Sequence, residues 1–333
     1  MSKPPPPHGL LIITGYIAVV LLLGAALAPP LFWACKGFVH IATSHGWDKA
    51  PVVSGITAFL RKIAFTSCYD RAALIAALLG LRPLFKAMQL QRSEFIGTTG
   101  FATGWKQLLT GFILAVVLII IMGVISMNLG VYKMARQPAW AVVAMPLISG
   151  LSVAFLEEFL FRGAVLSVLT RSLGARGGIL WTTLIFAIVH FLKPPAHEAI
   201  ADADVTWSSG FWVITQLFRG FGQWQDVIAE FLLLAGVGWM LALARRASSG
   251  LWAGIGLHAG WVAGMKYFSQ ITATTTALRE GRFSPWMVEN HCKAIVSSTV
   301  GLVPLITVLL TGWIMLWWCK RHCAQNHVAA SDE

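Results

Sequence analysis

The sequence predicts an all-α protein, a polytopic membrane bundle of about eight transmembrane helices. Of its 333 residues 57% are apolar and only 12% are charged, about half of the charged fraction of a typical soluble domain. The chain carries no charge between Lys3 and Lys36, or between Lys106 and Lys133. Each of these stretches is long enough to cross ~30 Å of hydrocarbon as a helix. An ordinary soluble enzyme is therefore excluded.

The apolar runs and the polar breaks between them define the individual helices. A further helix over residues 51–66 carries Arg61 and Lys62 in an otherwise apolar stretch, which favours a position on the membrane surface. The expected spans lie near residues 9–34, 70–90, 107–130, 139–170, 179–193, 227–244, 250–268 and 297–318.

The basic residues lie at the ends of these segments. The formal net charge is +11, but no run of Lys and Arg exceeds two residues, so nucleic acid is not an expected partner. Basic residues in the breaks near 82–106, 171–178 and 245–250 and in the tail fall on one side of an eight-span arrangement. The positive-inside rule then places both termini in the cytoplasm, and in a bacterium the membrane would be the plasma (inner) membrane.

Ionisable residues inside the expected spans are the first candidates for a functional site, because each is costly in lipid unless it is paired or faces water. They are Glu157, Glu158, Arg162, His190 and His258. On a helix Glu158 and Arg162 are four residues apart and can pair, whereas Glu157 is rotated by about 100°. We therefore expect Glu158 to be structural and Glu157 to be available for chemistry.

Depth estimates bring three of these side chains to one layer. The spans near 139–170 and 179–193 are expected to form an antiparallel hairpin that turns through residues 171–178. At 1.5 Å per residue, Glu157 lies ~20 Å, His190 ~17 Å and His258 ~12 Å from the same membrane side. Two glycine ridges on residues 250–268 would let this helix pack tightly on both faces. We expect the three polar side chains to converge inside the bundle.

Three motifs around these residues resemble the CPBP family of intramembrane proteases, which includes CAAX prenyl endopeptidases of the Rce1 type and bacteriocin self-immunity proteins. Glu157-Glu158-Phe159-Leu160-Phe161-Arg162 matches a Glu-Glu-x-x-x-Arg motif. Phe186 and His190 match Phe-x-x-x-His, and His258 begins the third motif. The third motif ends in Val262, where the family usually has Asn or Asp. The resemblance covers roughly residues 140–268.

The resemblance implies an endopeptidase that hydrolyses a peptide bond in a membrane-associated protein or peptide. It assigns Glu157 as the general base, with His190 and His258 orienting the water and stabilising the oxyanion; Glu158, Arg162, Phe186 and Val262 would be supporting residues. It also implies three regions: N-terminal helices and interfacial segments at 1–139, a protease core at 140–268, and a loop, last helix and tail at 269–333.

Three alternatives stay open beside this glutamic mechanism, which needs no cofactor. Zinc takes the same donor set, so Glu157, His190 and His258 would be its ligands in a metalloprotease, although the His-Glu-x-x-His helix motif is absent. A second alternative is a membrane chaperone or immunity-type binding protein without catalysis, which the Val262 departure from the family motif favours. A proton-coupled transporter would also use buried Glu and His, but the sequence has no duplicated halves.

Overall fold

The computed structural model describes residues 8–135, 143–192, 200–217, 219, 224–276 and 302–322. The described chain is helical apart from turns, connecting segments and one pair of short strands, which confirms the all-α prediction. It divides into two compact units. The first comprises residues 10–88 and 191–221, and the second comprises residues 1–9, 89–190 and 222–333.

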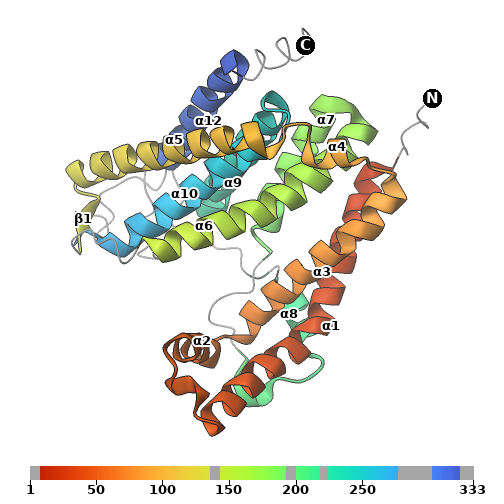
Figure 1. The fold of residues 1–333 in the computed structure, drawn as a ribbon, viewed down its shortest axis with the longest axis vertical. Coiled ribbons are helices and arrows are strands. Elements are labelled where there is room, and N and C mark those ends of the chain that lie inside the picture. The colour runs from red at the N-terminus through yellow and green to blue at the C-terminus, as the bar shows by residue number, and fades with distance from the viewer. Residues whose placement is uncertain are drawn as a thin grey trace. The chain divides into compact units, whose positions relative to one another are not determined.

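The first unit is built on two long helices that pack along each other, α1 (Gly9–Ser44) and α3 (Phe65–Met88). A Cβ at Gly24 of α1 would lie 2.9 Å from Ala73 Cα of α3, so glycine permits the close approach. The unit also contains α2 (Pro51–Arg61) and the short α8 (Ser209–Gln216) (Figure 1). Helix α2 confirms the helix expected within 51–66, and it meets α3 at 107°.

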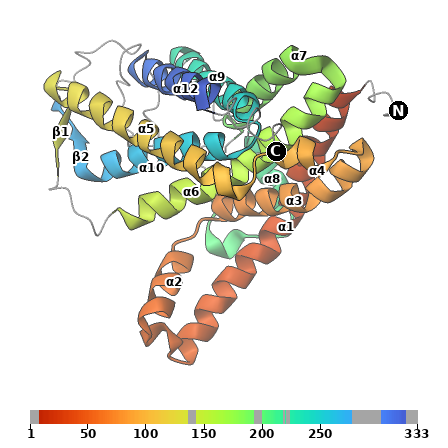
Figure 2. The same cartoon turned by 45° about the horizontal axis from the view of Figure 1, so that its top comes forward.

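The second unit holds all the candidate site residues. Helix α10 (Trp252–Ile271) lies between α5 (Phe101–Asn128) and α6 (Ala144–Glu157) (Figures 1 and 2). The strands β1 (Tyr132–Met134) and β2 (Thr272–Thr274) pair antiparallel, with Tyr132 opposite Thr274. The elements in chain order are α4 (Arg92–Ile96), α5 (Phe101–Asn128), β1 (Tyr132–Met134), α6 (Ala144–Glu157), η3 (Glu158–Val165), α7 (Leu166–Val189), α9 (Trp224–Ala247), α10 (Trp252–Ile271), β2 (Thr272–Thr274) and α12 (Leu302–His322).

Glycines let α10 pack closely against both of these neighbours. A Cβ at Gly256 would lie 2.1 Å from the Leu108 carbonyl oxygen of α5, and one at Gly260 would lie 2.6 Å from Ala115 Cβ. On the other face, Gly150 of α6 leaves room for the Ala259 carbonyl, which a Cβ there would approach to 2.8 Å. The predicted wedging of this helix between two neighbours is confirmed.

The chain reverses direction inside α7. Gly174 has φ 73° and ψ 176°, a conformation that glycine adopts far more readily than other residues. Beyond it, a Cβ at Gly178 would lie 2.8 Å from Thr170 Cα, so the two halves of α7 touch immediately. The hairpin expected through residues 171–178 is confirmed.

Four helical stretches among the described residues are long and apolar enough to cross a membrane: Gly9–Ser44, Phe101–Asn128, Ala144–Val189 and Val303–His322. A fifth is added if α2 and α3 form one bent span. Helix α10 is not among them, and it is buried continuously from Ala253 to Trp261. A helix shielded by its neighbours need not be strongly apolar. The expected number of eight spans stays a prediction.

Candidate active site

The Glu157-Glu158 pair marks the point where the regular helix changes. Helix α6 ends at Glu157, and residues Glu158–Val165 form a π-helix before α7 begins. The expectation of a regular α-helix across 139–170 is therefore wrong for this stretch. π-Helical turns bond each N–H to the carbonyl five residues earlier, so they are wider than α-turns, and they occur frequently at functional sites.

Glu158 is the centre of a buried polar network. Arg162 Nη1 donates to Glu158 Oε1 at 3.0 Å, and His258 Nδ1 lies 3.0 Å from the same oxygen. Arg162 Nη2 donates to the Gly238 carbonyl of α9 at 3.2 Å. The side chains of Glu158 and Arg162 are 1% and 0% exposed. The predicted Glu158–Arg162 pair is thus confirmed, and it ties the π-helix to α9 and α10.

Each histidine has one ring nitrogen held by a neighbour. His190 Nδ1 lies 2.6 Å from the Phe186 carbonyl oxygen; because a carbonyl only accepts, Nδ1 carries the proton and donates. His258 Nδ1 donates in the same way to the Glu158 carboxylate. In the neutral form of both rings Nε2 therefore keeps its lone pair.

The Nε2 atoms of both rings face Glu157. His190 Nε2 and His258 Nε2 each lie 3.8 Å from Glu157 Oε2, which is too long for a direct hydrogen bond. Among the described residues this oxygen has no hydrogen-bond partner, and the Glu157 side chain is 27% exposed. The predicted convergence of the three side chains is confirmed. Polar atoms at this separation can share a water molecule that lies beside them and hydrogen-bonds to each.

Phe186 links the two parts of the site. It is 1% exposed, and the Arg162 guanidinium stacks over its ring at 4.4 Å from the centroid. Its ring also lies 4.5 Å from the His190 ring, while its carbonyl fixes the tautomer of that histidine. Phe186 therefore positions Arg162 and His190.

Two glycines complete the site, and neither was expected there for this reason. A Cβ at Gly254 would lie 2.8 Å from Glu158 Oε2, so glycine leaves the space that the carboxylate occupies. Gly238 supplies the carbonyl that Arg162 binds. The sequence signals Gly254 only as part of a packing ridge, and it gives no signal for a backbone carbonyl, since every residue has one.

Val262 lies one turn beyond His258 on α10 and is partly buried. Its side chain has no hydrogen-bonding group. Lys266, one turn further, donates from Nζ to Ser149 Oγ of α6. It is thus directed to a partner other than Glu157.

The three side chains supply donor atoms that zinc binds, but the distances between these atoms are longer than in a zinc site. Two imidazole nitrogens and a carboxylate oxygen are a common zinc ligand set. Ligands at ~2.0–2.2 Å from a tetrahedral zinc are separated by roughly 3.3–3.5 Å, whereas both measured separations are 3.8 Å. No group of three His, Cys, Asp or Glu in the described ranges has metal-binding geometry.

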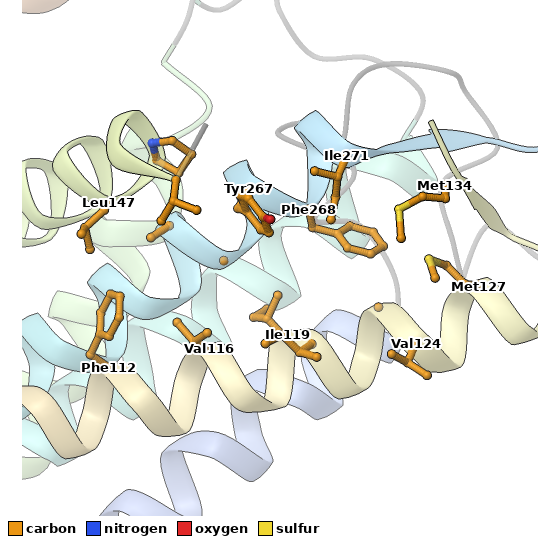
Figure 3. A pocket seen from close by; sticks show the side chains of 16 residues that line it. Phe112, Val116, Ile119, Val124, Met127, Met134, Leu147, Tyr267, Phe268 and Ile271 are labelled. Carbon is orange, nitrogen blue, oxygen red and sulfur yellow. The ribbon is translucent and has the colours of Figure 1, made fainter. Parts of the chain in front are cut away.

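An apolar cavity of about 500 Å³ lies elsewhere in the same unit, among α5, α6, α10 and β1 (Figure 3). Its labelled lining side chains include Phe112, Ile119 and Phe268, with the Tyr267 hydroxyl among otherwise apolar groups. Glu157, His190 and His258 do not line it. The cavity and the polar site are therefore separate features.

Comparison with known proteins agrees with this site. Residues 138–264 match the family model for type II CAAX prenyl endopeptidases, described as Rce1-like. A search of curated proteins gives no match. The match contains Glu157, Glu158, Arg162, His190 and His258, and with the long apolar helices it supports an integral membrane protein and a protease. Residues 138–264 thus resemble type II CAAX prenyl endopeptidases of the Rce1-like family, and the resemblance to the CPBP family is confirmed over that segment.

Proposed function

We propose that the protein is an intramembrane endopeptidase in which Glu157 activates a water molecule to hydrolyse a peptide bond of a membrane-associated substrate. The observation that carries this proposal is the arrangement around Glu157 Oε2. This oxygen has no hydrogen-bond partner among the described residues and lies 3.8 Å from the Nε2 atoms of both His190 and His258. A water beside these three atoms would donate one hydrogen to Glu157 and the other to a histidine.

The reaction follows from these atoms. Glu157 takes a proton from the water as the oxygen attacks the scissile carbonyl, and the carbonyl oxygen becomes an oxyanion. The tetrahedral intermediate collapses when Glu157 returns the proton to the leaving amine, which breaks the C–N bond and regenerates the carboxylate. No covalent bond forms between the enzyme and the substrate.

The two histidines have different partners, and we assign them different roles. An oxyanion needs a donor, and a ring whose Nδ1 already donates has an Nε2–H only as an imidazolium. His258 donates to the Glu158 carboxylate, and this negative charge would stabilise a positive charge that develops on the ring during the reaction. His190 donates to a neutral carbonyl, which gives no such stabilisation. We therefore assign the oxyanion to His258 and orientation of the water to His190.

Zinc remains the second candidate mechanism, because both histidines direct Nε2 toward Glu157. If zinc binds, Glu157, His190 and His258 would hold it, with small shifts to close the 3.8 Å separations, and it would supply a Lewis acid and an activated water. The supporting network of Glu158, Arg162 and Phe186 would orient the ligands in either mechanism.

Membranes from cells that produce the wild type or the Glu157→Gln variant test the proposal. Mass spectrometry of the peptide termini in each membrane fraction identifies cleaved proteins. We expect new termini with the wild type and none with the variant, at equal protein levels. The Glu94→Gln variant, which changes an exposed carboxylate of α4, is the matched control and should cleave normally. An identical set of termini from wild type and Glu157→Gln would refute the mechanism, and an absence of termini from both would favour a binding protein.

A further inference from the structure

The short helix α4 places one buried side chain against the π-helix. Residues 91–94 are exposed, whereas Phe95 is 6% exposed. Its ring meets the Phe159 ring edge to face, with 4.4 Å between the centroids. A Cβ at Gly163 would lie 2.5 Å from Phe95 Cε2, so the glycine leaves the space that the ring occupies. Phe95 thus packs against two residues of the π-helix that lie four positions apart.

The backbone beside this phenylalanine is fixed by neighbouring elements. The Glu94 carbonyl accepts hydrogen bonds from Ser167 Oγ of α7 at 2.7 Å and from Arg245 Nη2 of α9 at 3.0 Å. Just beyond α4, the Thr98 N–H donates to the Ser249 carbonyl, between α9 and α10, at 2.9 Å. Because these bonds use backbone atoms of the α4 segment, they do not depend on the Glu94 side chain. The aromatic ring is therefore held from outside the π-helix.

The register of the π-helix sets the directions of the side chains on either side of it. A π-turn is closed by a hydrogen bond one residue longer than that of an α-turn, and one residue of an α-helix is a rotation of ~100°. If Glu158–Val165 returned to α-helical register, residues before and after the change would rotate relative to one another. Glu157 precedes the π-helix and Arg162 lies inside it, so this rotation would change how they face each other.

This register matters for the proposed reaction because Glu158 holds His258. The Glu158 carboxylate accepts the bond from His258 Nδ1 at 3.0 Å, and Arg162 donates to the same oxygen. Nε2 of this ring, which we assign to the oxyanion, lies 3.8 Å from Glu157 Oε2. A shift of the Glu158 carboxylate would therefore move the ring relative to the general base. A misplacement of about 1 Å can lower a rate by about 10²-fold.

We propose that Phe95 is a positioning residue, which holds Glu158–Val165 in π-helical register and thereby keeps His258 aligned with Glu157. It acts through the packing of its ring on the π-helix. The role rests on the proposed function, because it aligns the groups of that reaction. Phe95 lies outside residues 138–264, the segment that matches the family model, so α4 adds to the active-site framework from another part of the chain.

The Phe95→Ala variant tests this role in the purified full-length protein in phosphatidylcholine proteoliposomes. Amide hydrogen exchange followed by mass spectrometry reports on residues 158–165 and needs no substrate. We expect faster exchange in this segment, because it loses its support and opens locally. Turnover is measured with synthetic apolar peptides that the wild type cleaves. We expect kcat to fall about 10- to 100-fold with KM unchanged, because the variant disturbs alignment and not substrate affinity.

Phe268→Ala is the matched control, because Phe268 packs in the same way elsewhere. It is 8% exposed, its ring meets the Tyr132 ring edge to face at 5.5 Å, and a Cβ at Gly123 would lie 2.6 Å from it. It lies ten residues, or ~15 Å, beyond His258 along α10. Both variants should lower the melting temperature, but Phe268→Ala should keep the wild-type kcat and the wild-type exchange of residues 158–165.

Phe95→Leu is the conservative variant. It keeps an apolar side chain of intermediate size, so it should retain more of the wild-type kcat than Phe95→Ala does. If Phe95→Ala fails to fold, Phe95→Leu carries the test. Its kcat should then be lower than that of the wild type, and exchange of residues 158–165 should be faster.

Three results would overturn the positioning role. The first is a wild-type kcat, or unchanged exchange of residues 158–165, in folded Phe95→Ala or, where that variant does not fold, in Phe95→Leu. The second is an equal fall in kcat in Phe268→Ala, which would assign the effect to a general loss of stability. The third is a change in KM alone, which would assign Phe95 to substrate binding. Failure of the proposed function looks different, since the wild type would then cleave no more than Glu157→Gln.

Discussion

Removing the guanidinium of Arg162 should destabilise the protein strongly, because Glu158 would stay buried with its charge uncompensated. The Arg162→Met change keeps most of the side-chain volume. It removes the 3.0 Å bond to Glu158 and the 3.2 Å bond to the Gly238 carbonyl, and it also removes the stacking on Phe186. Charged hydrogen bonds contribute ~1.5–3 kcal/mol each, and breaking one side of a buried pair costs about 3–5 kcal/mol. We expect a loss in the free energy of unfolding within that range.

Thermal melts of the purified protein in detergent measure this effect. Adding Glu158→Gln to Arg162→Met should recover part of the loss, since no buried carboxylate then remains unpaired. Arg171→Met is the matched control. Its ion pair with Glu94 is 3.6 Å long and partly exposed, so its loss should be below about 1 kcal/mol. If Arg162→Met melts like the wild type, or if the double variant is worse by the full sum of both changes, the buried network does not stabilise the bundle.

Three further predictions concern the site itself. Gly254→Ala places a Cβ 2.8 Å from Glu158 Oε2, so it should displace the carboxylate that holds His258 and lower kcat more than KM; Gly37→Ala, where no atom lies within 4 Å, should leave both constants unchanged. Val262→Asn adds an amide one turn from His258 and should raise turnover by up to ~10²-fold if oxyanion stabilisation limits the rate; a slower enzyme would mean that another donor already fills this role. Purified protein should contain less than one zinc per chain and keep its activity in strong chelators, and one tightly bound zinc that is lost together with activity in His190→Ala would establish the metal mechanism.

Much of the arrangement could be predicted from the sequence because the membrane restricts where polar groups occur. Long apolar runs indicate helices, and charged residues within them are rare enough to identify a site. The pairing of Glu158 with Arg162 follows from their spacing, and the convergence of Glu157, His190 and His258 follows from helix rise alone. Both agree with the observed contacts. The glycine ridges of α10 likewise indicate its close packing.

Other features depend on tertiary contacts that a periodic pattern does not contain. The π-helix over Glu158–Val165 differs from an α-helix only in hydrogen-bond register, and its residues are compatible with either form. The backbone carbonyls of Phe186 and Gly238 bind His190 and Arg162, and carbonyls have no sequence signal. Glu158 was expected to bind Arg162, but its contact with His258 depends on how α10 is seated against the π-helix.

Turnover of the purified Glu157→Gln variant in proteoliposomes, with thermal melts of the same sample, is the most direct measurement. The substitution keeps the size of the side chain and removes the base that faces His190 and His258. We predict a melting temperature close to that of the wild type and a fall in kcat of ~10²–10⁴-fold or more, as expected for loss of a general base. Wild-type turnover in a correctly folded Glu157→Gln protein would contradict the proposal that Glu157 activates the water.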